Sequence, residues 1–225
     1  MIADEERWDL IHQKTHTENT LHSKFAEDVE KNFPRSSIVL DIGGGTGSDA
    51  LYFLRKGHKV VLLDISAFAL KLAQSRAKEE NFGDKMVLKK IDFGFEDMPI
   101  KPNSVDIVYS RISLNYFGAK HTTKIFRDIL TLLKNGGKAF LSFKSPDDES
   151  EMEYLRNIAS VYEENVFIEN GQLRSRFTKE QIEVMLKNAG IQSYVVNPYK
   201  EDLTGYRKDH KNILFTNVIS FTKTE

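Results

Sequence analysis

Three glycines at alternate positions follow a short apolar run. Residues 38–42 are largely apolar and lead into Gly43, Gly45 and Gly47, after which a helical pattern begins. Glycine in a turn between a strand and a helix accepts positive φ angles and lets a ligand lie against bare backbone. The dinucleotide-binding fingerprint Gly-x-Gly-x-x-Gly would place its third small residue at Ser48, so the spacing here differs from that fingerprint. The loop therefore predicts a ligand other than a dinucleotide.

Aspartates stand at the ends of the first three predicted strands. Asp41 precedes the glycines, Asp64 follows the first glycine by 21 residues, and Asp92 comes after the third apolar run. A strand-end carboxylate such as Asp64 accepts hydrogen bonds from ribose hydroxyls, in NAD enzymes as well as in others. Asp92 and Phe93 offer a carboxylate for an adenine amino group and an aromatic face for its ring. S-adenosylmethionine (SAM) has no phosphate and carries an ammonium group that suits Asp41, so SAM is the predicted cofactor.

Strand and helix patterns alternate through the middle of the chain. Short apolar runs are separated by helical patterns, and this alternation predicts parallel βαβ units. We therefore expect an α/β fold with a doubly wound, mostly parallel seven-stranded sheet and helices on both faces. The predicted strands are residues 38–42, 60–64, 86–91, 105–109, 138–143, 193–197 and 213–222.

Two segments fall outside this alternation. Residues 1–34 contain no strand pattern and are expected to form an N-terminal helical extension that acts as a lid, whereas residues 35–225 form the main domain. Within that domain, an insertion of about residues 147–177 is expected to be partly helical, and its acidic start is expected to be a solvated loop. A helix should begin after Thr178, and residues 199–212 read as a polar loop.

The motifs together resemble those of the class I SAM-dependent methyltransferases, over roughly residues 36–145. The resemblance rests on the glycine loop, on Asp64-Ile65-Ser66, on the strand ends near residues 92 and 110, and on the turn at residues 135–137. In many relatives a Leu-Pro or Met-Pro pair follows the adenine-binding aspartate more closely than Pro99 follows Asp92, so Glu96 or Asp97 is an alternative partner. The implied cofactor-binding residues are Asp41, Gly43, Gly45, Gly47, Asp64, Ile65, Ser66, Asp92, Phe93, Ser110 and Arg111, and the implied product is S-adenosylhomocysteine (SAH).

The acceptor side is expected to combine the fourth strand's loop with the N-terminal segment. Tyr116 and His12 are the catalytic candidates, and Trp8, His16 and Asn115 are candidate substrate contacts. His12 and His16 are one helical turn apart, but no third ligand is evident, so no metal is predicted. The alternative for the N-terminal segment is that it only packs on the outer face of the sheet.

The amino-acid composition disfavours several classes of function. Lys and Arg total 32 against 33 Asp and Glu, and there is no cysteine. The balance disfavours a nucleic-acid partner, and no apolar run approaches the length of a membrane span, so we expect a cytoplasmic protein. The predicted function is in-line transfer of a methyl group from SAM to a small-molecule acceptor, while nothing indicates the oligomeric state.

Three alternatives remain open. The first is an RNA or protein methyltransferase with a local basic pocket, and the second is a SAM-binding protein without turnover. The third is a nicotinamide-dependent oxidoreductase, which the glycine spacing disfavours.

Overall fold

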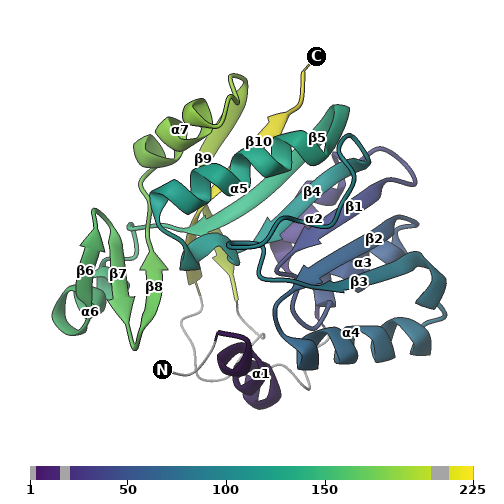
Figure 1. Ribbon diagram of the computed structural model, residues 1–225, viewed down its shortest axis with the longest axis horizontal. Coiled ribbons are helices and arrows are strands. Elements are labelled where there is room, and N and C mark those ends of the chain that lie inside the picture. The colour runs from purple at the N-terminus through teal and green to yellow at the C-terminus, as the bar shows by residue number, and fades with distance from the viewer. Residues whose placement is uncertain (1–3, 16–20, 204–212, 225) are drawn as a thin grey trace.

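The protein is built around a seven-stranded sheet. The computed structural model describes residues 4–15, 21–203 and 213–224. The strands are β1 (Ile38–Ile42), β2 (Lys59–Asp64), β3 (Met86–Lys90), β4 (Val105–Arg111), β5 (Leu133–Lys144), β9 (Tyr194–Asp202) and β10 (Ile213–Thr222). Their order is β3-β2-β1-β4-β5-β10-β9, and β10 runs antiparallel to both of its neighbours (Figure 1). The predicted fold class is confirmed.

The strand order reverses beside β1, and this places the glycine loop. Leu40 pairs with Val61 of β2 on one side and with Val108 of β4 on the other. In open α/β sheets, ligands bind beyond the carboxyl ends of the strands at such a reversal. The loop that leaves β1 and the ends of β2 and β4 therefore share one edge of the sheet.

Helices cover both faces, because each face is apolar. On one face, α2 (Lys24–Glu30), α3 (Ser48–Arg55) and α4 (Ala67–Glu79) pack against the sheet through buried residues such as Phe25, Phe53 and Ala73. On the other face, α5 (Ala119–Leu132) and α7 (Lys179–Asn188) bury Phe126 and Leu186 (Figure 1). In the described part of the chain, no helix is both long and apolar enough to cross a membrane.

The N-terminal segment divides into two parts with different surroundings. Helix α1 (Asp4–Thr15) lies beyond the carboxyl edge of the sheet and contacts α4 (Figure 1). Helix α2 instead belongs to the core, since Phe25 is 2% exposed and Ala26 is fully buried. Treating residues 1–34 as one lid was therefore wrong for α2, and only α1 lies where a lid would lie.

The insertion contains more strand than its sequence suggested. It consists of α6 (Glu149–Ile158) followed by β6 (Ser160–Glu163), β7 (Val166–Glu169) and β8 (Gln172–Ser175), which form a separate antiparallel sheet. The acidic run was wrongly interpreted as a solvated loop, because Asp148 caps α6 by accepting a hydrogen bond from the backbone of Glu151. Short strands of mixed polarity give little periodic signal, which explains why the sheet was missed.

The ends of several elements also differ from expectation. The turn at residues 135–137 interrupts β5 as an irregularity in its pairing with β4, and strand pairing continues on both sides of it. Strand β9 extends to Asp202 through Pro198, which an edge strand tolerates; the rest of the expected polar loop lies outside the described residues.

The predicted start of α7 is confirmed, since Thr178 and Gln181 form a reciprocal capping box.

Candidate functional site

The glycine loop adopts backbone angles that other residues resist. Gly43, Gly45 and Gly47 have φ angles of +70°, +54° and +79°. The backbone N–H of Gly43 donates to the carbonyl of Leu63 over 2.7 Å, which ties the loop to the end of β2. Gly47 then forms the N-cap of α3. The loop lies at the edge where the strand order reverses, with Gly43 half-buried and Gly45 and Gly47 buried.

Asp64 connects this loop to the next one. Its carboxylate accepts hydrogen bonds from the backbone N–H groups of Gly45 and Ser66, each at 2.8 Å. Burial raises the pKa of Asp64 to about 6, although these two hydrogen bonds act in the opposite direction. A backbone hydrogen bond from Ile65 lowers the pKa of Asp64 in the same way. The predicted ribose-binding residues therefore lie together and surround one buried carboxylate.

Asp41 is a buried acid whose second oxygen is not hydrogen-bonded. Only 1% of the residue is exposed, and its Oδ2 atom has no hydrogen-bond partner among the described residues. Burial raises the pKa of Asp41 well above its ordinary value, and the nearby carboxylates of Asp49 and Asp64 raise it further. A cation would relieve this environment, because an isolated buried carboxylate is costly. The loop and its two acids therefore fit a ligand such as SAM, which bears an ammonium and ribose hydroxyls.

The expected adenine residues lie beside this loop. Asp92 accepts a hydrogen bond from the backbone of Gly94 at 3.2 Å, and its own N–H donates to Glu96 at 3.1 Å. Burial raises the pKa of Asp92 above its ordinary value. Phe93 is 7% exposed and its ring lies 5.5 Å from that of Phe117. Their adenine contact stays a prediction, as does the alternative role of Glu96.

Ser110 and Arg111 end β4 on the same edge, and both have partners within the protein. The Ser110 hydroxyl donates to the carbonyl of Ile42 at 2.9 Å, so it joins the ends of β4 and β1. The Arg111 guanidinium donates twice to one oxygen of Glu201, at 2.8 and 3.0 Å. Burial opposes the charge of Arg111, but Glu201 and Asp49 act in the opposite direction and the pKa of Arg111 is raised. A direct cofactor contact by either side chain stays a prediction.

Helix α1 covers residues that are predicted to bind the cofactor as well as the predicted acceptor side. Asp9 accepts hydrogen bonds from the Ser66 hydroxyl at 2.5 Å and from the Phe68 backbone at 3.1 Å. A Cβ atom built on Gly45 would lie 2.9 Å from His12 Cε1, so the imidazole rests on the glycine loop. Burial lowers the pKa of His12 to about 4. Helix α1 therefore contacts residues predicted to bind SAM, and its role as a lid stays a prediction.

Aromatic residues meet where the acceptor side is predicted. The Trp8 ring meets the Tyr116 ring edge-on, with centroids 4.8 Å apart. Burial raises the pKa of Tyr116, so its hydroxyl is neutral at neutral pH. Tyr116 belongs to the short helix η2 (Leu114–Tyr116), which follows β4. The structure thus brings Trp8, His12 and Tyr116 together, whereas His16 lies outside the described residues.

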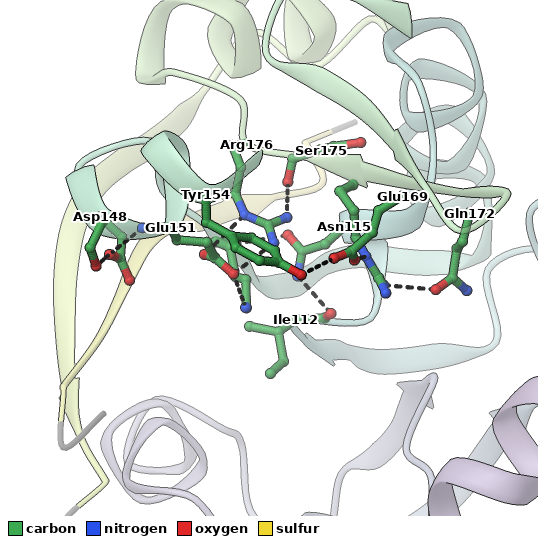
Figure 2. Close-up of polar contacts among 12 residues, drawn as sticks. Ile112, Asn115, Asp148, Glu151, Tyr154, Glu169, Gln172, Ser175 and Arg176 are labelled. Atoms are coloured by element: carbon green, nitrogen blue, oxygen red, sulfur yellow. Dashed lines mark hydrogen bonds and ion pairs between the residues drawn. The ribbon is translucent and has the colours of Figure 1, made fainter. Parts of the chain in front are cut away.

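Asn115 is placed to hold the backbone. Its side-chain nitrogen donates to the Ile112 carbonyl at 2.6 Å, as Figure 2 shows, and its oxygen accepts from the Lys144 backbone at 2.8 Å. These bonds connect the ends of β4 and β5. A substrate contact by Asn115 stays a prediction, and its observed contacts indicate a positioning role. In the described ranges, no three His, Asp or Glu side chains cluster as a metal site would.

Sequence reasoning missed three residues of this region. Asp9 of α1 accepts a hydrogen bond from Ser66, the N-cap of α4, which is 57 residues away in the chain. Glu201 pairs with Arg111 across 90 residues. Arg174 of β8 lies over the Tyr116 ring, 5.2 Å from its centroid. Each is a single charged residue whose partner is distant in the chain. Nothing in local spacing distinguishes such residues from ordinary surface charges.

Comparisons with known proteins agree with this geometry. A family model described as a methyltransferase domain matches residues 39–137. A sarcosine/dimethylglycine N-methyltransferase of Aphanothece halophytica is 31% identical over 111 residues, which make up 49% of this chain and 39% of that protein. The chain spans 36 to 42% of the length of the first curated relatives it matches.

Solved structures share the fold over most of the chain. A SAM-dependent methyltransferase from Methanosarcina mazei has a TM-score of 0.71 at 19% identity, covering 88% of this chain and 97% of that one. Phosphoethanolamine N-methyltransferase 2 of Haemonchus contortus, in complex with phosphomonomethylethanolamine and SAH, has a TM-score of 0.73 at 19% identity. It covers 100% of this chain and 61% of that one. At these identities the likeness establishes the fold.

The raised pKa of Asp64 predicts how SAM binding varies with pH. Ribose hydroxyls donate to the ionised carboxylate, so binding draws the folded-state pKa down from about 6. SAM affinity should therefore fall about tenfold from pH 7 to pH 5. In Asp64→Asn the affinity should be lower at pH 7 but change less than about threefold over this range. Calorimetric titration at each pH measures this, and an unchanged pH profile in the variant would contradict the assignment.

The same carboxylate affects stability in the absence of ligand, and the sign is opposite to that of an ion-paired acid. Because the pKa of Asp64 is raised above 3.8 in the folded protein, its contribution favours folding at low pH and is lost as pH rises toward about 6. The lowered pKa of His12 works in the other direction. Wild type and variant should therefore be compared at each pH.

The contact between His12 and Gly45 predicts a clash in Gly45→Ala. The alanine would have to keep a φ of +54°, and its methyl group would press on the His12 imidazole. We expect a loss of about 2 to 4 kcal/mol in unfolding free energy, from backbone strain and overpacking together. Gly57→Ala is the control, because its φ is +92° and nothing lies within 4 Å of the built Cβ. It should lose only the strain component, about 1 kcal/mol.

A double variant separates the two causes. Adding His12→Ala to Gly45→Ala should recover part of the loss if the imidazole is what the methyl group meets. Denaturant titration of the wild type, Gly45→Ala, Gly57→Ala and the double variant measures the unfolding free energy of each. Equal losses of unfolding free energy in Gly45→Ala and Gly57→Ala would show that α1 does not rest on the loop.

Proposed function

We propose that this chain, a class I SAM-dependent methyltransferase in its fold and in the family match over residues 39–137, moves the methyl group of SAM to a small-molecule acceptor. The glycine loop with Asp41 and Asp64 would hold the cofactor. The space beside Tyr116 would receive the acceptor. SAM supplies an electrophilic methyl group on a sulfonium, and the protein has to align the acceptor with it and keep water out.

The small-molecule assignment is supported by one observation: α1 and the insertion together cover the edge of the sheet. Helix α1 reaches both sides of the site, because Trp8 contacts Tyr116 and the Arg7 guanidinium donates to the Asn170 carbonyl at 2.8 Å. Asn170 lies between β7 and β8 of the insertion. The two added segments thus meet over the edge where the ligands of this fold bind. A covered edge of this kind favours a small acceptor over an RNA or protein chain.

The groups beside the acceptor space favour a nucleophile that binds with a free lone pair. His12, with a pKa of about 4, is neutral at pH 7 and is a weak base, and Tyr116 is neutral as well. General-base catalysis works best with a group whose pKa lies near the working pH. An amine acceptor needs no base once it is bound deprotonated, whereas a hydroxyl does. Relatives named as N-methyltransferases of sarcosine, dimethylglycine and phosphoethanolamine support this preference.

The function predicts selective binding of SAM and SAH. At about 100 times its dissociation constant, either ligand should stabilise the folded protein by about 2.7 kcal/mol, and NADH should give no shift. Asp64→Ala should lower SAM affinity at least tenfold, since it removes charge-assisted hydrogen bonds to the ribose. Mass spectrometry of ligand retained through purification provides an independent readout. A shift with NADH and none with SAM would instead support an oxidoreductase.

Helix α1 is proposed to act as a lid, and Trp8→Ala tests this role. Loss of the indole opens the acceptor side while leaving Asp41 and Asp64 in place. SAH affinity should stay within about threefold, and SAH production from SAM with small secondary amines should fall about tenfold or more. Leu10→Ala, at a 39% exposed position on the same helix, is the control.

If the protein binds SAH but methylates no compound in a broad panel of amines, thiols and alcohols, it would be a SAM-binding protein without activity.

A further inference from the structure

A cluster of charged side chains lies where the insertion meets the sheet edge. Lys144 at the end of β5 donates to Glu151 of α6 at 2.6 Å. Arg176 donates to both oxygens of the same carboxylate, at 2.9 and 3.1 Å. Arg174 of β8 donates to Glu169 of β7 at 2.7 Å. Figure 2 shows Arg176 beside Glu151 and, next to this pair, the Tyr154 hydroxyl beside Glu169.

The charges in this cluster do not balance. Three cations share two carboxylates, because Glu151 serves both Lys144 and Arg176. Glu169 has its own second partner, the Tyr154 hydroxyl at 2.9 Å. The side chains of Lys144, Arg174 and Arg176 are 27%, 21% and 4% exposed, so the surplus positive charge is largely removed from water. Buried charge of one sign is costly unless a counter-charge accompanies it.

The surplus charge lies beside the proposed acceptor space. The Arg174 guanidinium carbon is 5.2 Å from the centroid of the Tyr116 ring. Trp8 of α1 also contacts that ring, edge-on. Lys144 ends β5 at the carboxyl edge of the sheet, and Asn115 fixes its backbone there. The cofactor residues Asp41 and Asp64 are separate from this cluster and carry the opposite charge.

The electrostatics of Lys144 agree with this placement. Burial lowers the pKa of Lys144, and the positive charge of Arg176 lowers it further, while Glu151 acts in the opposite direction. An additional anion near the ammonium would offset the first two effects. Arginine adds geometry to charge, since its planar group can bind carboxylate or phosphate through two parallel hydrogen bonds.

We propose that the methyl acceptor carries an oxyanion, a carboxylate or a phosphate ester, that binds between Lys144 and Arg174. This inference rests on the proposed function, since it assigns the far end of the acceptor to the insertion while the nucleophile faces the cofactor. The insertion thereby determines which acceptors fit. A neutral or purely cationic small molecule would leave the surplus charge uncompensated.

The test uses the full-length protein saturated with SAH and titrates inorganic phosphate and acetate as probes by calorimetry. Wild type should bind at least one of the two anions in the millimolar range. Lys144→Gln and Arg174→Gln should each weaken that binding at least tenfold, and Lys144→Arg should retain it within about threefold. Lys124→Gln is the matched control, because Lys124 of α5 pairs with Asp128 away from the cluster. The melting temperature of each variant shows whether it is folded.

The outcomes separate this inference from the proposed function. Failure to bind SAH would overturn the function. Normal SAH binding with no anion affinity up to about 50 mM, or with affinity that survives both Gln variants, would overturn the oxyanion subsite alone. Tighter binding of phosphate than of acetate supports a phosphoryl acceptor, and the reverse order supports a carboxylate. If Lys144→Gln does not fold, Lys144→Arg and Arg174→Gln still give the comparison.

Discussion

Two buried carboxylates at the ends of neighbouring strands are the constraint on which this site depends. Asp41 and Asp64 lie under the glycine loop with 1% and 6% of their surface exposed, and burial raises the pKa of each. Gly45 and Ser66 satisfy Asp64 through their backbone, whereas Asp41 keeps one oxygen without a hydrogen bond among the described residues. Two buried acids of this kind would favour a cationic ligand with hydroxyl donors.

The acceptor side has the opposite electrostatic character. Around Tyr116 the protein places Arg174 from the insertion and Trp8 from α1, and Lys144 at the end of β5 belongs to the same charged cluster as Arg174. A cationic cofactor and an anionic acceptor group would thus be held at opposite ends of one covered space. Such an arrangement sets the orientation of both reactants through long-range charge, and the aromatic residues between them keep water away from the reacting atoms.

Much of the fold could be predicted from the sequence, because the βαβ units are encoded locally. Apolar runs, glycine turns and the capping box at Thr178 each identify an element from its own residues. The small sheet escaped prediction because β6 and β8 have only four residues each and little alternation. In the site, the glycine loop and Asp64 were found for the same local reason. Asp9, Arg174 and Glu201 were missed because only the tertiary fold pairs them with distant partners.

Pro198 in β9 affects whether the edge of the sheet can pair with another strand. Strand β9 is the outer strand of the sheet, and Pro198 in its middle supplies no N–H group for a further strand. The neighbouring Lys200 is exposed on the same strand. Sheets aggregate by adding strands to open edges, and an interrupted, charged edge makes that addition unfavourable. The addition of another strand along this border of the sheet is therefore disfavoured.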